Sequence, residues 1–346
     1  MKGIGIIILL LWILAVPVSA LEIQAPVVPD SGSRWMPENW DSFGDALAEL
    51  VNKGLSQLVP EVKNALSVSA KVLSILLILA VLQTVSGQAK GACVLAGNIG
   101  ISAVLLGETG AMITMGMDTV RQITDYGKLL LPVMTGAVAA QGGITTSAAL
   151  YAGTAAGMTL LSNITASVLI PGIKLYLVVC MVSCASGEDI LKRMADAIRT
   201  GSSWLLKTLM IVFTTYLSLS GVVSGTTDAA ALKAAKVTIS SVVPVVGGIL
   251  SDASEAVLVS TGILKNAAGI YGILAVLAVF LTPFLRLSSH YIVLKLTAAV
   301  GSVFGSKIAI SLVDGFSTAM GLLLAVTGGC CMMVLISTVC FMRCMQ

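Results

Sequence analysis

Long stretches in which charged residues are almost absent dominate this sequence. Each of seven stretches holds at most one basic residue and no acidic one, and most approach the ~20 apolar residues that a helix needs to cross a bilayer. Only 11% of the 346 residues are charged, against about 25% in soluble domains. The chain has too little polar surface for a soluble globule, and we predict an integral membrane protein. The stretches are residues 68–87, 92–107, 154–186, 204–223, 267–285, 289–304 and 315–339.

The first twenty residues have the pattern of a secretory signal. Lys2 precedes an apolar run over residues 4–16, and Pro17 and a small-residue tripeptide end the segment at Ala20. We predict a signal peptide over residues 1–20 with cleavage after Ala20. The alternative is an uncleaved first anchor helix. Under both interpretations, the residues that follow are delivered outside the cytoplasm.

Residues 21–67 are predicted to form an extracytoplasmic head. They carry seven acids and three bases, whereas residues 68–346 carry a net charge of +6, as the positive-inside bias would produce. Apolar residues recur every three or four positions, which predicts an amphipathic helix with a break before Pro60. Three uses of its apolar face remain open: lying on the membrane, docking a partner, or packing on the protein's own outer face. The face comprises Trp40, Phe43, Leu47, Leu50, Leu55, Leu58, Val62 and Leu66.

Two shorter apolar runs, residues 129–140 and 237–250, are interrupted by Pro132 and Pro244. We predict half-helices or re-entrant segments there, which are tolerated at membrane depth only where protein or water surrounds them. The long stretch over residues 154–186 has room for a kinked single pass or a double pass at Pro171.

The spacing of the prolines suggests an internal repeat. Beyond residue 68 there are four prolines, and Pro132 to Pro171 and Pro244 to Pro283 are both 39 positions apart. We predict an N-terminal membrane hairpin over residues 68–128, followed by copies over residues 129–230 and 231–346.

Charge suggests an orientation for the two copies. Lys192, Arg193 and Arg199 predict a cytoplasmic loop, and the matching positions of the second copy lack these bases, which favours an inverted repeat. The crossing pattern of residues 92–150 stays open. The predicted fold is all-α, with about six to eight transmembrane helices, re-entrant or broken segments and a candidate inverted repeat.

The rare residues exclude most enzyme chemistry. His290 is the single histidine, and none of the seven cysteines lies in the predicted head. No zinc-type motif or nucleophile elbow occurs, and residues 301–307 lack the spacing of a phosphate loop. We therefore predict no catalytic residues, no metal and no cofactor. A net charge of +3 also argues against nucleic-acid binding.

Polar residues in apolar surroundings are the functional leads that remain. Gln141, Thr145, Asn163 and Asp314 are candidates for lining a pathway, because burying them in lipid is costly. The ordinary alternative is a packing role through interhelical hydrogen bonds. A stand-alone secondary transporter is the alternative function, with a midplane site at the broken segments near Pro132, Gln141 and Pro244.

Two motifs resemble a known family. Residues 126–132 read YGKLLLP and residues 141–149 read QGGITTSAA. Together with the signal, the acidic head and the polytopic body, they resemble the stage III sporulation protein AE family of endospore-forming bacteria. The resemblance extends over nearly the whole chain and brings no catalytic pattern with it.

The resemblance implies a role in sporulation. Members are multi-pass proteins of the cell membrane, specifically the mother-cell membrane that faces the engulfed forespore. They work with other proteins of the same operon, including a cytoplasmic ATPase and ring-forming subunits. The prediction is thus a non-enzymatic membrane component of the secretion-like channel between mother cell and forespore, whose direct partners are those proteins and the lipid bilayer, with no nucleic acid.

Overall fold

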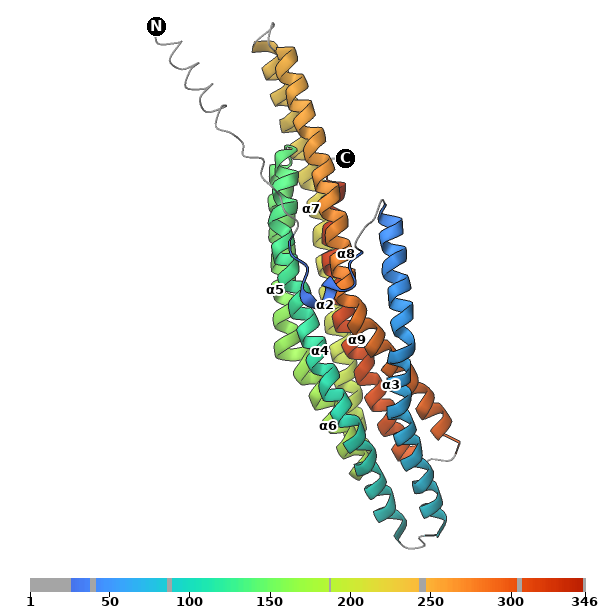
Figure 1. Ribbon diagram of the computed structural model, residues 1–346. Helices are drawn as coiled ribbons and strands as arrows, with labels where there is room; N and C mark the ends of the chain where they lie inside the picture. The colour runs from blue at the N-terminus through green and yellow to red at the C-terminus, as the bar shows by residue number, and fades with distance from the viewer. Residues whose placement is uncertain are drawn as a thin grey trace.

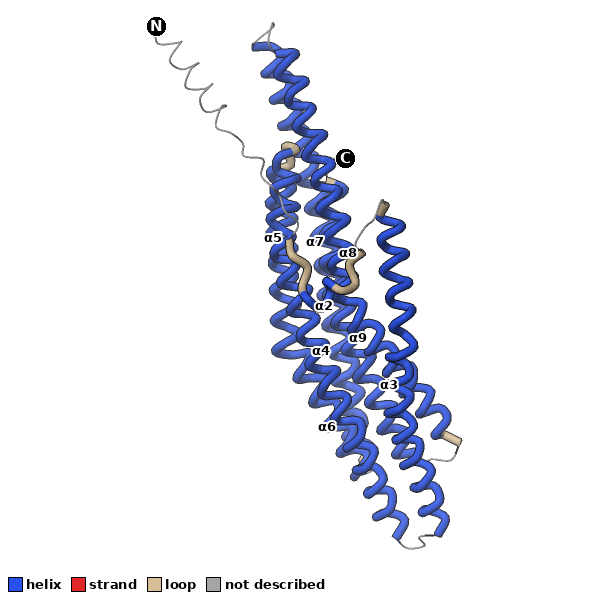
Figure 2. The backbone as a smooth tube through the Cα atoms, viewed as in Figure 1, coloured by secondary structure: helices blue, strands red, loops and turns tan. Residues whose placement is uncertain are grey.

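The computed structural model describes residues 26–37, 42–85, 89–186, 188–242, 247–303 and 307–344, with side chains described outside positions 90 and 221–265. Within these ranges the chain is helical, with short turns and no strand (Figure 2). The all-α prediction is confirmed. The predicted signal with Ala20, the head residue Trp40 and the proline at 244 lie outside the described residues.

Six long helical rods form the bundle (Figure 1). Each described rod is long and apolar enough to cross a membrane, at the lower end of the predicted six to eight. A short helix, α2, precedes them, and a π-helix, η2, joins α5 to α6 in one rod. The elements are α2 (Asp30–Ser33), α3 (Phe43–Val85), α4 (Lys90–Ala140), α5 (Ile144–Ile164), η2 (Thr165–Leu169), α6 (Ile170–Ser186), α7 (Asp189–Val242), α8 (Gly247–Gly301) and α9 (Lys307–Arg343).

Consecutive rods run in opposite directions. In Figure 1, α3, the α5–α6 rod and α8 descend, whereas α4, α7 and α9 ascend. The ends of α7 and α8 that face each other extend past the other helices at the top of the view. The segment around α2 lies at mid-height, where it packs chiefly on α8.

Two predicted breaks at prolines are absent. α3 continues through Pro60, and residues 129–140 are the last turns of an unbroken α4 that contains Pro132, not a half-helix. Proline in a helix interior costs about 3 kcal/mol. Packing on both sides of each proline offsets this cost, because the buried side chains of both flanks lie against the bundle. These are Leu50 and Ala65 around Pro60, and Leu130, Leu131 and Met134 around Pro132.

The helical rods also continue past Pro171 and Pro283 without turning back. The π-helix Thr165–Leu169 comes just before Pro171, where the shifted hydrogen-bonding pattern accommodates the ring, so residues 144–186 make one pass. Pro283 lies inside α8, which joins the predicted stretches 267–285 and 289–304 into one helix.

The described part of the candidate repeat does not have the inverted orientation. Pro171 and Pro283 lie on the third and fifth rods, which run in the same direction. The turns that follow these rods, before Asp189 and before Lys307, therefore lie at the same end of the bundle (Figure 1). The missing bases in the second segment are not explained by an inverted orientation.

The α4–α5 turn explains the QGG sequence. Gln141 ends α4, and Gly142 has a φ of 92°, a left-handed conformation that favours glycine. The amide groups of Gly142 and Gly143 donate to the carbonyls of Ala139 and Val138 at the end of the helix.

The bundle has two hydrophobic cores, stacked along its long axis. The upper core draws mainly on residues 120–138 of α4, 150–169 of α5 and η2, 206–217 of α7, 268–279 of α8 and 326–341 of α9. The lower core draws mainly on residues 68–79 of α3, 101–113 of α4, 170–184 of α6, 287–298 of α8 and 309–323 of α9.

Candidate functional site at the junction of the two cores

A belt of charged residues lies where the two cores meet. On α4 and α8 these residues lie where one core ends and the other begins. On α6 and α7 they lie within about two turns of that boundary, and Glu61 precedes the lower-core part of α3. Contacts across the bundle align the helices at this level, since Gly116 of α4 packs near Thr327 of α9, and Gly329 of α9 packs against Leu206 of α7. We call this set the charged belt: Glu61, Asp118, Arg121, Lys174, Lys207 and Arg286.

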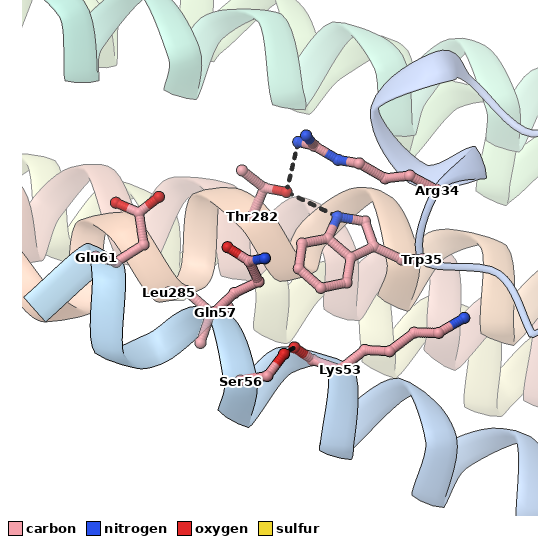
Figure 3. A pocket seen from close by; sticks show the side chains of 8 residues that line it. All are labelled: Arg34, Trp35, Lys53, Ser56, Gln57, Glu61, Thr282 and Leu285. Atoms are coloured by element: carbon pink, nitrogen blue, oxygen red, sulfur yellow. Dashed lines mark hydrogen bonds between the residues drawn. The ribbon is translucent and has the colours of Figure 1, made fainter.

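A polar cavity of about 270 Å³ opens at this level. Its walls come from the N-terminal segment beside α2, from the first half of α3 and from α8 (Figure 3). In this view Arg34 and Glu61 stand at opposite ends, with Thr282 and Gln57 between them. We call it the junction cavity; it is lined by Arg34, Trp35, Lys53, Ser56, Gln57, Glu61, Thr282 and Leu285.

Thr282 anchors the N-terminal segment to α8. Its hydroxyl oxygen accepts a hydrogen bond from Nε1 of Trp35 at 2.9 Å and one from Nη2 of Arg34 at 3.2 Å. The Arg34 guanidinium also lies 5.6 Å from the Trp35 ring centroid, a cation–π distance. Trp35 packs with Leu50 and Ala278, so the segment is held by apolar burial as well as by hydrogen bonds.

Further contacts bind this segment to both neighbouring helices. Ser31 donates a hydrogen bond to Gln122 of α4, and Gly32 lies close against Val279 of α8. Lys53 of α3 donates to the Met36 carbonyl at 3.4 Å and pairs with Glu49 at 2.8 Å. The N-terminal segment therefore fills the space between α4, α8 and the upper part of α3.

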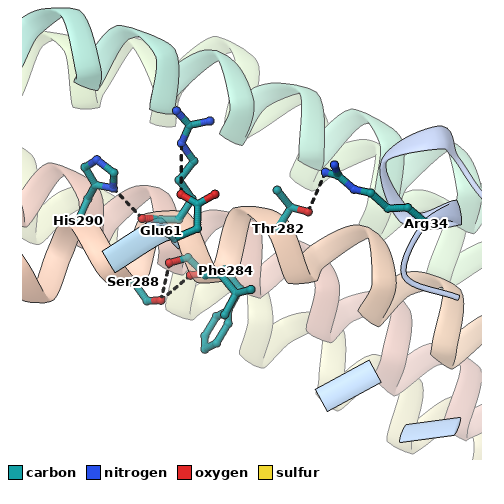
Figure 4. Close-up of polar contacts among 8 residues, drawn as sticks. Arg34, Glu61, Thr282, Phe284, Ser288 and His290 are labelled. Carbon is teal, nitrogen blue, oxygen red and sulfur yellow. Dashed lines mark hydrogen bonds and ion pairs between the residues drawn. The ribbon is translucent and has the colours of Figure 1, made fainter. Parts of the chain in front are cut away.

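Glu61 and Arg286 form a loose ion pair at the lower end of the cavity (Figure 4). Nε of Arg286 lies 3.9 Å from Oε2 of Glu61, which is too long for a hydrogen bond, and neither atom has a hydrogen-bond partner. Both atoms are shielded from solvent. The Glu61 oxygen could therefore still accept a hydrogen bond and the Arg286 nitrogen could still donate one, because no described residue forms these bonds.

Of the two serines beside His290, Ser288 bonds within its own helix, whereas the buried Ser289 hydroxyl has no hydrogen-bond partner among the described residues. Ser288 donates to the Phe284 carbonyl at 2.6 Å, and Nδ1 of His290 lies 3.0 Å from the Arg286 carbonyl (Figure 4). These are helix-backbone contacts.

The four predicted polar leads do not form one site. Gln141 is buried at the α4–α5 turn, and its side-chain oxygen has no hydrogen-bond partner. Thr145 and Asn163 are exposed on α5. Asp314 lies in the lower core region, far along the bundle from the α4–α5 turn (Figure 1).

Asp314 has an ion-pair partner. Nζ of Lys295 on α8 lies 2.5 Å from Oδ1 of Asp314 on α9, and both side chains are roughly half exposed. The charge of this acid is therefore compensated within the chain.

The predicted basic loop is the start of a helix. Lys192, Arg193 and Arg199 lie on the first turns of α7 and are exposed together with Asp196. None of the four forms an ion pair among the described residues. We call them the α7 polar face. Ala195, between them, belongs to the lower core.

No group of histidine, cysteine and acidic residues in the described part of the chain can hold a metal ion. The seven cysteines are free thiols.

Sequence reasoning missed the junction cavity. Thr282 and Trp35 are 247 positions apart, and no local pattern connects them. Arg286 was the available signal, because it interrupts an otherwise apolar run directly after Pro283.

Six apolar rods and two stacked cores define a multi-pass helical membrane protein. The family model for stage III sporulation protein AE matches residues 41–343. The chain belongs to this family and is a membrane protein involved in stage III sporulation, as the motifs predicted.

One curated relative is stage III sporulation protein AE of Bacillus subtilis (strain 168), 23% identical over 208 residues. The match covers 60% of this chain and 52% of that protein, so the chain spans about half the length of its relative. No solved structure matches the chain.

Proposed function

We propose that this protein is a non-enzymatic membrane subunit of the channel that connects mother cell and forespore. It acts in the mother-cell membrane with the other proteins of its operon, including the cytoplasmic ATPase and the ring-forming subunits. Membership of the sporulation family supports the biological setting. The channel role rests on one feature of the bundle.

That feature is the α7 polar face. The lower core is the layer in which the apolar half of α3 lies, so we place the bilayer there. α9 covers this layer from Lys307 to the charged belt in about 20 residues, or about 30 Å, which matches a hydrocarbon core. At the same depth, α7 exposes Lys192, Arg193, Asp196 and Arg199.

Lipid cannot solvate these charges cheaply. A charged side chain costs roughly 2.5–3.5 kcal/mol at the bilayer centre even on the most lenient scales, and less toward the bilayer edge, so Arg199, the deepest residue of the face, would bear the largest cost. The neighbouring α6 surface is apolar and exposed, with Leu175, Val178 and Val182 between 47% and 53% accessible. One side of the bundle thus suits lipid, and the α7 side suits water or another subunit, as expected of a channel component.

The orientation follows from the same arrangement. The N-terminal segment lies at mid-height of the bundle, above the lower core, whereas α7 starts at the lower end (Figure 1). With a cleaved signal, the junction cavity faces the space between the membranes. The α7 polar face then lies in the half of the bilayer nearest the cytoplasm, in agreement with the positive-inside bias, and the start of α7 points to the side on which the ATPase would act.

Affinity capture from sporulating cells tests this function. A tagged, complementing copy should co-purify with the ATPase and the ring-forming subunits after gentle solubilisation. Deleting the gene should block sporulation after engulfment and leave vegetative growth normal. An intact protein recovered alone in good yield, or an unchanged spore yield, would contradict the proposal.

The stand-alone transporter has lost its structural motivation. It depended on broken segments at Pro132 and Pro244 and on an inverted repeat; α4 is continuous through Pro132 and the rods that carry Pro171 and Pro283 are parallel, while Pro244 lies outside the described residues.

A further inference from the structure

We propose that the junction cavity binds the headgroup of a phospholipid that carries both a phosphate and a primary ammonium group, as phosphatidylethanolamine does. This inference is separate from the channel role. It concerns what fills the space between Arg34 and Glu61 when the protein sits in a bilayer.

The Arg34 end of the cavity suits a phosphate. The guanidinium has five N–H donors, and Nη2 donates to Thr282 while the side chain stays exposed. Its planar fork matches phosphate oxygens, and Lys53, which pairs with Glu49, lines the cavity on the same side (Figure 3).

The Glu61 end suits an ammonium group. Oε2 of Glu61 is shielded and accepts no hydrogen bond, because Arg286 is 3.9 Å away. A primary ammonium carries three donors and would satisfy this carboxylate. A purely anionic ligand, such as free phosphate or an acidic side chain, would leave Glu61 unsatisfied and add repulsion.

The surroundings suit a lipid rather than a soluble zwitterion. The two helices that line the cavity also carry exposed apolar side chains on their outer faces, with Leu55 at 58%, Val59 at 70% and Phe284 at 43% accessibility. Trp35 lies at the same level, as aromatic residues do at membrane interfaces. The charged belt marks the edge of the lower core, where headgroups would lie if that core is in the bilayer.

The size of the cavity agrees with a headgroup. Its volume of about 270 Å³ lies just below the roughly 300–1,000 Å³ of pockets that enclose drug-sized ligands. It can enclose a headgroup while the acyl chains lie outside, along α3 and α8.

Lipid retention by the full-length protein tests the proposal. The purified protein would be equilibrated in detergent with equal amounts of phosphatidylethanolamine, phosphatidylcholine and phosphatidylglycerol, and bound lipids counted by native mass spectrometry. We expect phosphatidylethanolamine to be retained most, because a quaternary ammonium cannot donate a hydrogen bond and phosphatidylglycerol lacks an ammonium group.

Variants connect retention to the cavity. Arg34→Gln and Glu61→Gln should each lower phosphatidylethanolamine retention by about tenfold to a hundredfold, the effect of losing a charge-assisted hydrogen bond. Lys63→Gln is the matched control, since Lys63 is exposed on α3 and does not line the cavity. It should retain lipid like the wild type.

Two results would overturn the proposal. One is unchanged retention in folded Arg34→Gln and Glu61→Gln proteins, and the other is equal retention of all three lipids. Arg34→Lys and Glu61→Asp keep the charges, and thermal unfolding of every variant separates lost binding from lost folding. Co-purification of the operon partners is an independent readout, so failure here leaves the channel proposal intact.

Discussion

At the scale of single residues, Thr282 joins the N-terminal segment to the helical body. Thr282→Val keeps the shape and removes the acceptor for Arg34 and Trp35. Because Trp35 is buried, its indole N–H would lose its partner, and we expect a loss of about 1–3 kcal/mol in stability. Thermal unfolding in detergent would measure it. Thr114→Val, at an exposed α4 position whose hydroxyl bonds within its own helix, should unfold like the wild type; equal unfolding temperatures for both variants would argue against the anchor.

The α4–α5 turn gives a second residue-scale prediction. Gly142→Ala places a Cβ at a φ of 92°, which costs roughly 1–2 kcal/mol. Gly136→Ala is the control, because that glycine is helical and has open space around it. It should stabilise α4 by about 0.5–1 kcal/mol. Chemical denaturation of both variants should therefore give changes of opposite sign, and a stabilised Gly142→Ala would show that the turn does not require glycine.

The sequence could predict single residues as polar leads, but not their partners. Asp314 stood out as an acid in an apolar run, and its partner Lys295 is 19 positions away on the preceding helix. Arg34 and Thr282 are 248 positions apart, so only the packed bundle brings them together.

At the scale of helices, composition predicted where apolar rods occur and misjudged where they end. Pro60 and Pro132 were given too much weight, because a local sequence window shows the cost of a proline but not the packing on either side of it. At Pro171 the sequence left a kinked single pass and a double pass open; the structure has a single pass, with a π-helix just before the proline.

Helix packing between α5 and α7 can be tested at Gly153. A Cβ there would lie 1.9 Å from Cε1 of Tyr216, whose hydroxyl donates to the Ala149 carbonyl at 3.2 Å. Gly153→Ile should push α7 away and cost about 1–3 kcal/mol through overpacking. Urea or thermal unfolding would measure the loss.

Two comparisons interpret that result. Gly201→Ile, at a helical position with open space around it, should have little packing cost. Combining Gly153→Ala with Tyr216→Ala should remove the clash and recover part of the stability. A Gly153→Ile protein as stable as Gly201→Ile would mean that α5 and α7 do not pack closely here.

At the scale of the whole molecule, the α7 polar face separates a channel subunit from a protein surrounded by lipid. In a cysteine-free background, a single cysteine would be placed at Arg199 on this face, and another at Ile78, which is 60% exposed on the apolar surface of α3. Charged, membrane-impermeant thiol reagents need a hydrated thiolate, so Arg199→Cys should react faster than Ile78→Cys, on the order of tenfold or more.

Labelling would be compared without the operon partners and in the assembled complex. Labelling that is fast alone and slows in the complex would place a subunit against the face, and fast labelling in both would place water there. Arg199→Cys as unreactive as Ile78→Cys under both conditions would mean that lipid covers α7, and the main structural support for the channel role would be lost.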